Sequence, residues 1–153
     1  ALWVGTNPKL KGLDIAEKAA RIAGIKLIVA GVPGKSTNTV KYLGRIRPEL
    51  MPKVYNSADL LLFPSNYESY PLTPLEAMAS GLPVVVSESS HVEIMKDGRE
   101  GFIIASKSPE KYAEAVRKAM DSRKKLGRSA RKTAEKYNWQ KQAKQYIRLY
   151  EKF

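Results

Sequence analysis

Short apolar runs alternate along the chain with longer stretches in which apolar residues recur every three or four positions. The short runs predict β-strands, because they are rich in Val, Ile, Leu and aromatic residues and are bounded by Gly, Pro or polar residues. Six runs have this form: residues 2–5, 26–31, 40–44, 60–63, 83–87 and 101–104. Strands that alternate with helices are typical of a parallel sheet with right-handed crossovers. We therefore predict an α/β fold with a Rossmann-like, doubly wound parallel sheet of about six strands.

The longer stretches predict helices. Between the strands, the predicted helices cover residues 12–23, 48–58 and 74–80. Three consecutive amphipathic helices follow the sixth strand, over residues 109–121, 123–137 and 139–152. We expect these C-terminal helices to pack on one flank of the sheet. The spacing of Trp139 to Tyr146 and Ile147 predicts that the indole belongs to the core.

The composition indicates a folded, globular protein. The 153 residues are 43% hydrophobic, and we expect them to form a single domain over 1–153. No apolar run approaches the roughly 18 residues of a membrane span. The chain has no cysteine, which excludes disulfides and thiolate metal sites, and its single histidine leaves few metal schemes. We expect a cytoplasmic location, with room for peripheral contact at the inner face of the membrane.

The net charge of +12 is concentrated in the C-terminal part of the chain. Residues 1–100 hold 12 Lys and Arg against 10 Asp and Glu, whereas residues 101–153 hold 15 against 5. Such a basic surface fits an anionic membrane, nucleic acid or an acidic partner. A solvated face of ordinary surface helices is the alternative explanation.

Two carboxylates, Glu68 and Glu76, lie eight positions apart around a predicted strand-to-helix turn. The strand over 60–63 is followed by a loop, and the segment Thr73-Pro74 predicts the start of a helix. Crevices at the carboxyl ends of parallel strands bind ligands, and the N–H groups of a helix N-terminus there attract anions. Thr73 and Glu76 also have the spacing of a capping box, in which Glu76 would bond the N-cap N–H. Glu68 has no comparable capping role, and the alternative to a functional role is a solvated loop residue just past the end of the strand.

An ordered set of short motifs surrounds these carboxylates and extends over nearly the whole chain. The set is Val4-Gly5, Lys11-Gly12, Leu43-Gly44-Arg45, Ser57-Ala58-Asp59, Pro64-Ser65, Glu68, Leu75-Glu76-Ala77-Met78-Ala79, Gly81-x-Pro83-Val84-Val85, Glu93-Ile94, Asp97-Gly98-x-x-Gly101 and Trp139. It resembles the C-terminal, donor-binding half of GT-B retaining glycosyltransferases of the glycogen-synthase, sucrose-synthase and mannosyltransferase group. A lone pair of glutamates would be a weak signal, but this ordered set is specific.

The resemblance implies roles for three charged side chains. Glu68 would lie beside the donor sugar, and Glu68 and Lys11 would be the catalytic residues. Glu76 would accept hydrogen bonds from the ribose hydroxyls, because one carboxylate can accept from two vicinal hydroxyls. Lys11 would pair with the diphosphate and stabilise the charge that develops as the leaving group departs.

The resemblance also implies a set of mainly backbone contacts to the nucleotide. The N–H groups of Leu72 and Thr73 would hold the diphosphate at the helix N-terminus. The base would lie against the backbone of Arg45, Ile46 and Arg47, and Gly5 completes the nucleotide-binding set. Backbone contacts do not reveal the base, so UDP-, GDP- and ADP-linked sugars all remain candidates.

Some positions depart from the family pattern. Thr6 stands where many members have an arginine, and Pro71 replaces a common glycine and offers no N–H. No Asp-x-Asp is present, so we expect a metal-independent enzyme without a cofactor. His91 and Glu93 follow the fifth strand; His91 would touch the sugar phosphate or serve as a surface or capping residue, and Glu93 would be a helix-first-turn carboxylate.

The resulting hypothesis is a donor-binding domain for retaining sugar transfer from a nucleoside diphosphate sugar to an acceptor hydroxyl. An N-terminal acceptor domain is absent from these 153 residues, so we expect the chain alone to bind nucleotide and transfer little. One alternative is a non-catalytic basic module that binds anionic membrane or nucleic acid, although nucleic acid is the less favoured partner. Another is a sugar-nucleotide epimerase or phosphorylase of related fold.

Overall fold

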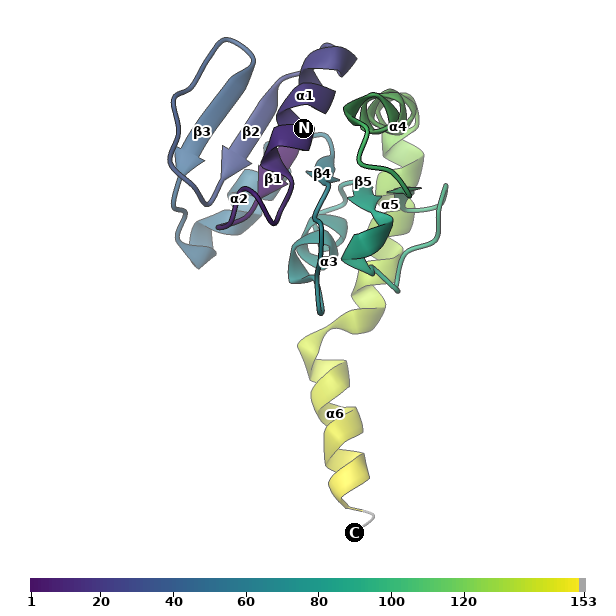
Figure 1. Cartoon of the computed structure of the whole chain (residues 1–153). Helices are drawn as coiled ribbons and strands as arrows, with labels where there is room; N and C mark the ends of the chain where they lie inside the picture. Colours follow the sequence, from purple (N-terminus) through teal and green to yellow (C-terminus); the bar gives the residue numbers. More distant parts are fainter. Residues whose placement is uncertain (152–153) are drawn as a thin grey trace.

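A single sheet of six strands forms the centre of the molecule (Figure 1). The computed structural model describes residues 1–151. The strands are β1 (Leu2–Val4), β2 (Leu27–Ala30), β3 (Val40–Gly44), β4 (Leu61–Phe63), β5 (Val84–Ser87) and β6 (Gly101–Ile104). They are all parallel, in the order β3-β2-β1-β4-β5-β6, so the chain reverses its direction of winding between β1 and β4. The predicted fold class is confirmed.

Six α-helices accompany the sheet in the described part of the chain. They are α1 (Leu13–Ala23), α2 (Met51–Asn56), α3 (Leu72–Ala79), α4 (Pro109–Asp121), α5 (Arg123–Ala134) and α6 (Trp139–Tyr150). Short 3₁₀ turns precede α2 (Pro48–Leu50), follow β5 (Glu88–Ser90) and join α5 to α6 (Glu135–Tyr137). Most bounds lie within two residues of the predicted ones. The predicted end of the last helix at Lys152 lies outside the described residues.

Helix α1 shows why these segments fold as they do. Its apolar residues recur at helical spacing, so one face buries Leu13, Ala16 and Ala20. The alanines are small and allow α4 to pack closely against this helix. The helix ends at Gly24, whose φ of 74° is the left-handed conformation that only glycine adopts readily.

The sheet has a separate apolar core on each face. One core lies under α1 and α4 and includes Trp3 and Leu62. The other lies under α2, α3 and α5 and includes Leu2 and Phe63. Neighbouring residues of β1 and β4 point to opposite faces, and both faces are covered, which is why these strands are apolar along their whole length.

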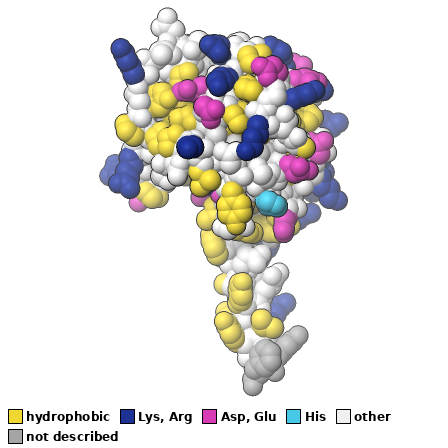
Figure 2. Space-filling model, in the orientation of Figure 1, with side chains coloured by type: hydrophobic (Ala, Val, Ile, Leu, Met, Phe, Trp, Pro, Cys, Tyr) yellow, Lys and Arg dark blue, Asp and Glu magenta, His cyan; other side chains and the backbone are white. Residues whose placement is uncertain are grey.

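The C-terminal helices are placed differently from the expectation that they pack together on one flank. Helix α4 covers the α1 face, whereas α5 packs against α3 on the opposite face. Helix α6 extends away from the rest of the molecule (Figure 1), and none of its residues is buried. Trp139 is 79% exposed, so its predicted place in the core is wrong. Apolar side chains line α6 in the space-filling view (Figure 2).

Helical spacing alone could not reveal this exposure. The apolar residues of α6 do share one face, as the sequence predicts, but nothing in residues 1–151 covers that face. An amphipathic pattern indicates that a helix has a partner surface without showing where that surface lies. Over residues 1–151, no helix combines the length and the apolar character that crossing a bilayer requires.

Candidate functional site

The loops that follow β1 and β4 meet at the carboxyl ends of these two neighbouring strands. Gly12, with φ of 63°, lies so close to the loop after β4 that an added Cβ would be 2.1 Å from the Pro64 carbonyl oxygen. The Asn66 backbone N–H donates to the Leu10 carbonyl at 2.8 Å, and the Asn66 side chain donates to the Lys9 carbonyl at 3.0 Å. The two loops therefore form one rigid wall at the switch point of the sheet, where open α/β folds bind ligands.

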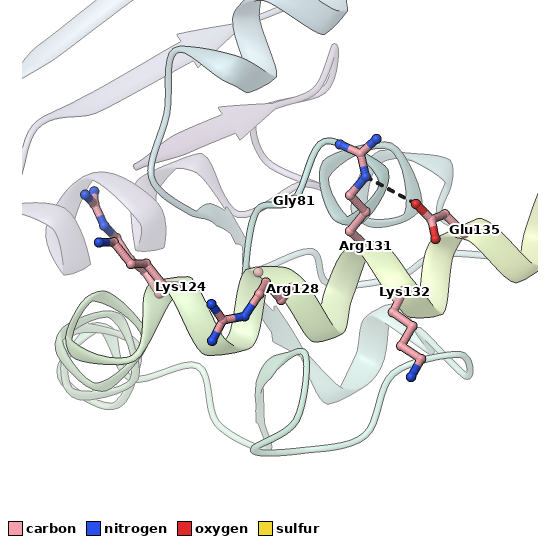
Figure 3. A pocket seen from close by; sticks show the side chains of 8 residues that line it. Gly81, Lys124, Arg128, Arg131, Lys132 and Glu135 are labelled. Carbon is pink, nitrogen blue, oxygen red and sulfur yellow. Dashed lines mark hydrogen bonds and ion pairs between the residues drawn. The ribbon is translucent and has the colours of Figure 1, made fainter.

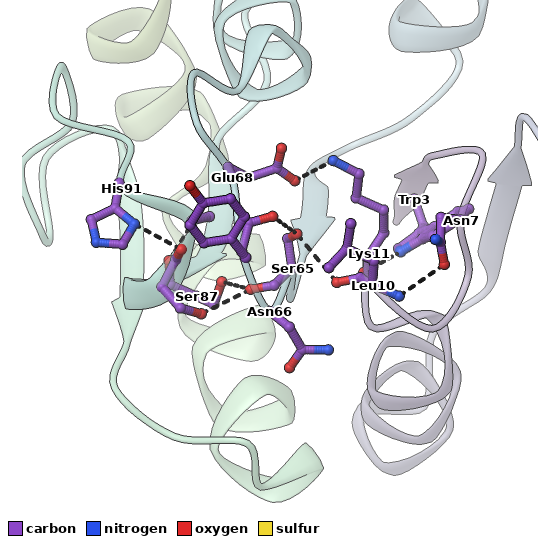
Figure 4. A network of polar contacts seen from close by, with 12 residues as sticks. Trp3, Asn7, Leu10, Lys11, Ser65, Asn66, Glu68, Ser87 and His91 are labelled. Carbon is purple, nitrogen blue, oxygen red and sulfur yellow. Dashed lines mark hydrogen bonds and ion pairs between the residues drawn. The ribbon is translucent and has the colours of Figure 1, made fainter.

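Lys11 and Glu68, the two predicted catalytic residues, form an ion pair across this wall. Lys11 Nζ lies 2.5 Å from Glu68 Oε1, and both side chains are largely buried, with 23% and 10% exposure (Figure 4). The ammonium also lies 5.7 Å from the centre of the Phe63 ring. The Trp3 indole N–H donates to the Lys11 carbonyl at 2.9 Å and so fixes the backbone of this lysine.

Gly5 leaves room for the Lys11 side chain. A Cβ at Gly5 would lie 2.9 Å from the Trp3 ring and 3.0 Å from Lys11 Cγ. A larger residue at the end of β1 would therefore push the lysine away from Glu68. The absence of a side chain also leaves the backbone open to close approach by a ligand.

Helix α3 begins two residues earlier than predicted, and the capping-box prediction is wrong. The N-cap is Pro71, in extended conformation, and no side chain caps the helix. Thr73 therefore lies inside the first turn. Because Pro71 has no N–H, Glu76 has no N-cap donor to bond, and the reciprocal bond of a capping box cannot form.

Glu76 instead accepts a hydrogen bond from a residue that the sequence analysis did not single out. The Tyr55 hydroxyl, from α2, donates to Glu76 Oε2 at 2.7 Å. Burial raises the pKa of Tyr55 far above its usual value, and the bond to Glu76 raises this pKa further. The phenol is therefore a permanent donor at neutral pH. A pairing across 21 residues leaves no local signal in the sequence.

The first turn of α3 presents the two N–H groups that were predicted to hold a diphosphate. Leu72 and Thr73 are the first two residues of the helix, so their N–H groups precede its first internal hydrogen bond. Pro74 contributes no N–H to this end. The side chain of Leu72 is exposed, which indicates that this end of the helix is open to solvent.

The predicted base-binding segment Arg45, Ile46 and Arg47 follows β3 at the same end of the sheet. Both arginines are exposed, whereas Ile46 packs against the core on the α3 face. Gly31 connects this segment to the β1 loop: its N–H donates to the Gly44 carbonyl at 2.8 Å, and an added Cβ would lie 2.3 Å from the Gly5 carbonyl oxygen. Strand β3 is two positions from β1 in the sheet, so this segment and Lys11 follow different strands at the same carboxyl-end edge of the sheet.

A network of serines orients the loop that carries Glu68. The Ser65 carbonyl accepts hydrogen bonds from the hydroxyls of Ser87 and Ser89, and the Ser65 hydroxyl donates to the Tyr67 carbonyl at 3.1 Å (Figure 4). Ser65 follows β4, whereas Ser87 ends β5 and Ser89 follows it. The network therefore joins the carboxyl ends of β4 and β5. Serines in a loop are too common for the sequence to indicate this role.

His91 and Glu93 lie beyond this network, and both are exposed. The ring Nδ1 of His91 is 2.8 Å from the Ser89 carbonyl oxygen. The backbone of His91 is left-handed, with φ of 47°, and among residues 1–151 it is the only non-glycine residue with positive φ. Glu93 lies in a loop and not in a helix, so its predicted place in a first helical turn is wrong. Both residues line a pocket of about 300 Å³ beside the N-terminus of α3, together with Tyr70, Pro71 and Tyr137.

A second concave surface lies on α5, away from this crevice. It has a volume of about 650 Å³, and Gly81, which precedes β5, forms part of it (Figure 3). The cations that line it are Arg123, Lys124, Arg128, Arg131 and Lys132. Glu135 neutralises part of this charge through an ion pair with Arg131 at 3.3 Å.

The described residues contain no group of three or more His, Asp or Glu side chains arranged to hold a metal ion. At the candidate site, Glu68 is paired with Lys11 and Glu76 with Tyr55. The chemistry that the site offers is therefore two carboxylates, one ammonium and a helix N-terminus.

Comparisons with known proteins identify the family and the fold. The family described as "Glycosyl transferases group 1" matches residues 1–137. D-inositol 3-phosphate glycosyltransferase of Corynebacterium urealyticum is 30% identical over 97% of this chain and 42% of its own length. The chain thus spans less than half of this relative.

Two solved structures show the same fold. The C-terminal domain of a glycosyl transferase group 1 family protein (LpcC) from Francisella tularensis has a TM-score of 0.75 and 19% identity, and covers 88% of this chain and 84% of that domain. Pneumococcal O-GlcNAc transferase GtfA, in complex with UDP and GlcNAc, has a TM-score of 0.85 and 18% identity over 99% of this chain and 35% of its own. The chain belongs to the group 1 glycosyltransferases and has the fold of the C-terminal domain of a GT-B enzyme.

Proposed function

We propose that the chain binds a nucleoside diphosphate sugar in the crevice at the ends of β1 and β4, as the donor-binding part of a retaining hexosyltransferase. The observation that carries the proposal is the Lys11–Glu68 ion pair, which joins the two loops at the switch point of the sheet. Family membership supports sugar transfer over the epimerase, phosphorylase and purely binding alternatives. A relative of the same fold binds UDP.

Each charged group has a task in this proposal. Lys11 and the N–H groups of Leu72 and Thr73 bind the diphosphate. When the bond between the anomeric carbon and the phosphate oxygen breaks, this oxygen keeps the electron pair, and Lys11 stabilises the added negative charge. Glu68 favours the positive charge that develops on the sugar, and Glu76 accepts hydrogen bonds from the ribose.

The same charges make a metal ion dispensable. The ammonium of Lys11 and the N-terminus of α3 bring positive charge to the place where the diphosphate would lie. Neither carboxylate has to hold a cation, because Glu68 faces Lys11 and Glu76 faces Tyr55. We infer a metal-independent transfer that needs no cofactor, and unchanged nucleotide binding in excess EDTA is the expected result.

The acceptor is proposed to bind to a second domain that these residues do not include. The chain spans 42% of a curated relative and 35% of a solved one. The uncovered apolar face of α6, with Trp139 and Tyr146 exposed, supports a partner surface beyond the described residues. The chain alone is therefore expected to bind donor and to transfer little, so robust transfer to a free sugar by these residues would contradict this part of the proposal.

A second proposal concerns the basic concave surface on α5. Six of the twelve residues of α5 are Lys or Arg and none is acidic. This charge suits binding to anionic lipid at the inner, cytoplasmic face of the membrane. We expect binding to vesicles with anionic lipid that falls steeply with added salt and weakens in Arg128→Glu/Lys132→Glu. Equal binding to neutral vesicles would contradict it, and salt-sensitive binding to DNA but not to vesicles would favour nucleic acid.

Calorimetric titration with UDP, GDP and ADP, and with their sugar conjugates, tests the main proposal. One base is expected to bind, and Glu76→Ala is expected to weaken binding about tenfold or more, because two ribose hydroxyls lose a charged acceptor. Glu114→Ala is the matched control, since Glu114 is an exposed carboxylate on α4 that pairs with Lys118. Absence of binding by every nucleotide would refute the proposal.

A further inference from the structure

The hydrogen bond between Tyr55 and Glu76 joins a buried side chain to an exposed one. Tyr55 is 2% exposed and belongs to the core on the α3 face, whereas Glu76 is an exposed residue of α3. A buried, rigid donor therefore holds one oxygen of a carboxylate that faces solvent. An exposed glutamate on a helix otherwise changes rotamer freely and gives up this freedom when a ligand binds.

The direction of this hydrogen bond is fixed by the protonation of the phenol. Burial and the neighbouring carboxylate both raise the pKa of Tyr55, while the Thr73 hydroxyl acts on it in the opposite, weaker sense. Tyr55 thus donates and Glu76 accepts throughout the neutral range. The bond uses Oε2 and leaves the other carboxylate oxygen and the remaining lone pairs to accept from a ligand.

We propose that Tyr55 is a positioning residue that sets the orientation of Glu76 for the ribose hydroxyls of the nucleotide. This inference rests on the proposed function. The α2 helix fixes the phenol, the phenol fixes the carboxylate, and the carboxylate accepts from the vicinal hydroxyls without first losing rotamer freedom. Tyr55 itself does not touch the ligand.

Tyr55→Phe tests the proposal, because it removes one oxygen and keeps the buried ring. The nucleoside diphosphate that binds the unchanged chain is expected to bind the variant about three- to tenfold more weakly, which corresponds to one lost hydrogen bond. The analogue without ribose hydroxyls, the 2′,3′-dideoxynucleoside diphosphate, is expected to bind both proteins equally. In the Glu76→Ala background, Tyr55→Phe is expected to have no further effect.

The chain provides a matched control for the loss of a tyrosine hydroxyl. Tyr42, on β3, donates to Glu17 Oε1 at 2.5 Å and packs against the core on the opposite, α1 face. Tyr42→Phe removes a Tyr–Glu hydrogen bond of the same kind outside the crevice, and nucleotide binding is expected to be unchanged. An equal loss in Tyr42→Phe and Tyr55→Phe would overturn the positioning role, because it would assign the effect to the fold.

A ligand-free measurement separates this inference from the proposed function. Side-chain NMR couplings of Glu76 are expected to show one dominant rotamer in the unchanged chain and averaging in Tyr55→Phe, whereas Tyr42→Phe leaves them unchanged. An identical rotamer distribution in Tyr55→Phe would overturn the inference even if nucleotides bind. If the couplings change as expected but no nucleotide binds, Tyr55 orients Glu76 and the proposed function fails. The ribose hydroxyls are then not the ligand of this carboxylate.

Discussion

The crevice at the ends of β1 and β4 differs from helix α6 in the kind of side chain that it presents and in whether that side chain has a partner. In the crevice, four polar side chains are paired between different segments of the chain: Lys11 pairs with Glu68, and Tyr55 with Glu76. On α6, large apolar side chains such as Trp139 are exposed, and no residue is buried. These two side-chain pairs of the crevice thus form within the chain, whereas α6 presents an apolar face that the described residues do not cover.

The largest expected difference between the two regions is in stability. Leu62→Ala, in the fully buried centre of β4, is expected to lower the free energy of unfolding by about 2–5 kcal/mol because it removes apolar contacts and leaves a cavity. Trp139→Ala removes a larger side chain, but Trp139 is exposed, so the free energy of unfolding is expected to change by less than about 0.5 kcal/mol. Urea unfolding followed by circular dichroism measures both. Comparable losses would mean that α6 packs on the domain in solution.

The close approach of the two crevice loops gives the next largest effect. Gly12→Ala is expected to cost about 2–4 kcal/mol, since the residue has a left-handed backbone and the added Cβ meets the Pro64 carbonyl at 2.1 Å. Gly24→Ala is the matched control: its φ is 74°, but nothing lies within 4 Å of the added Cβ, so about 1 kcal/mol is expected. Equal costs for the two variants would show that the loops can separate freely.

Alkaline pH reports on the packed part of the molecule with a smaller effect. Burial raises the pKa of Tyr112 from 10.0 to about 12, against a smaller lowering by Ser87. Between these values the unfolded chain has lost a proton that the folded chain keeps, so stability falls as pH rises from about 10 to 12. The contribution of Tyr112 is expected to be about 2–3 kcal/mol, at about 1.4 kcal/mol for each pKa unit. Tyr112→Phe should show a shallower decline in urea unfolding over this range, and parallel declines would contradict the assignment.

The smallest effect on stability is expected at the ion pair of the crevice. Lys11→Met keeps the apolar stem and removes the charge, but it leaves the largely buried Glu68 carboxylate without its partner, so the free energy of unfolding should fall by about 1–2 kcal/mol. Nucleotide affinity, in contrast, is expected to fall at least about tenfold, because the diphosphate loses its ammonium partner. Lys11→Arg, which keeps the charge, is the comparison variant. A stability loss as large as that of Leu62→Ala would make the pair a structural element.

The features that the sequence predicts well are those set by local pattern. Alternating apolar runs placed all six strands within about two residues, and the crossover rule made the sheet parallel. The ion pair of Lys11 and Glu68 is not among these features: it forms because the loops after two neighbouring parallel strands share one edge of the sheet. That these strands are neighbours depends on the strand order, which local pattern does not contain.

Other features depend on contacts between distant segments or on a single residue. Tyr55 was missed because its partner lies 21 residues away and one buried tyrosine resembles any other. The capping box was predicted wrongly because the spacing of Thr73 and Glu76 fits, while Pro71 takes the N-cap position two residues earlier than the pattern requires. Trp139 was predicted as core because periodicity does not distinguish a covered apolar face from an uncovered one.

The hydrogen bond from the Trp3 indole to the Lys11 carbonyl gives the crevice an optical reporter. Trp3 is fully buried, and its N–H is 2.9 Å from the backbone of the lysine that is proposed to meet the diphosphate. The only other tryptophan of the sequence, Trp139, is exposed on α6 and is separable by Trp139→Phe. The resulting single-tryptophan protein would emit from the wall of the crevice alone, so that fluorescence could follow ligand arrival there without any attached dye.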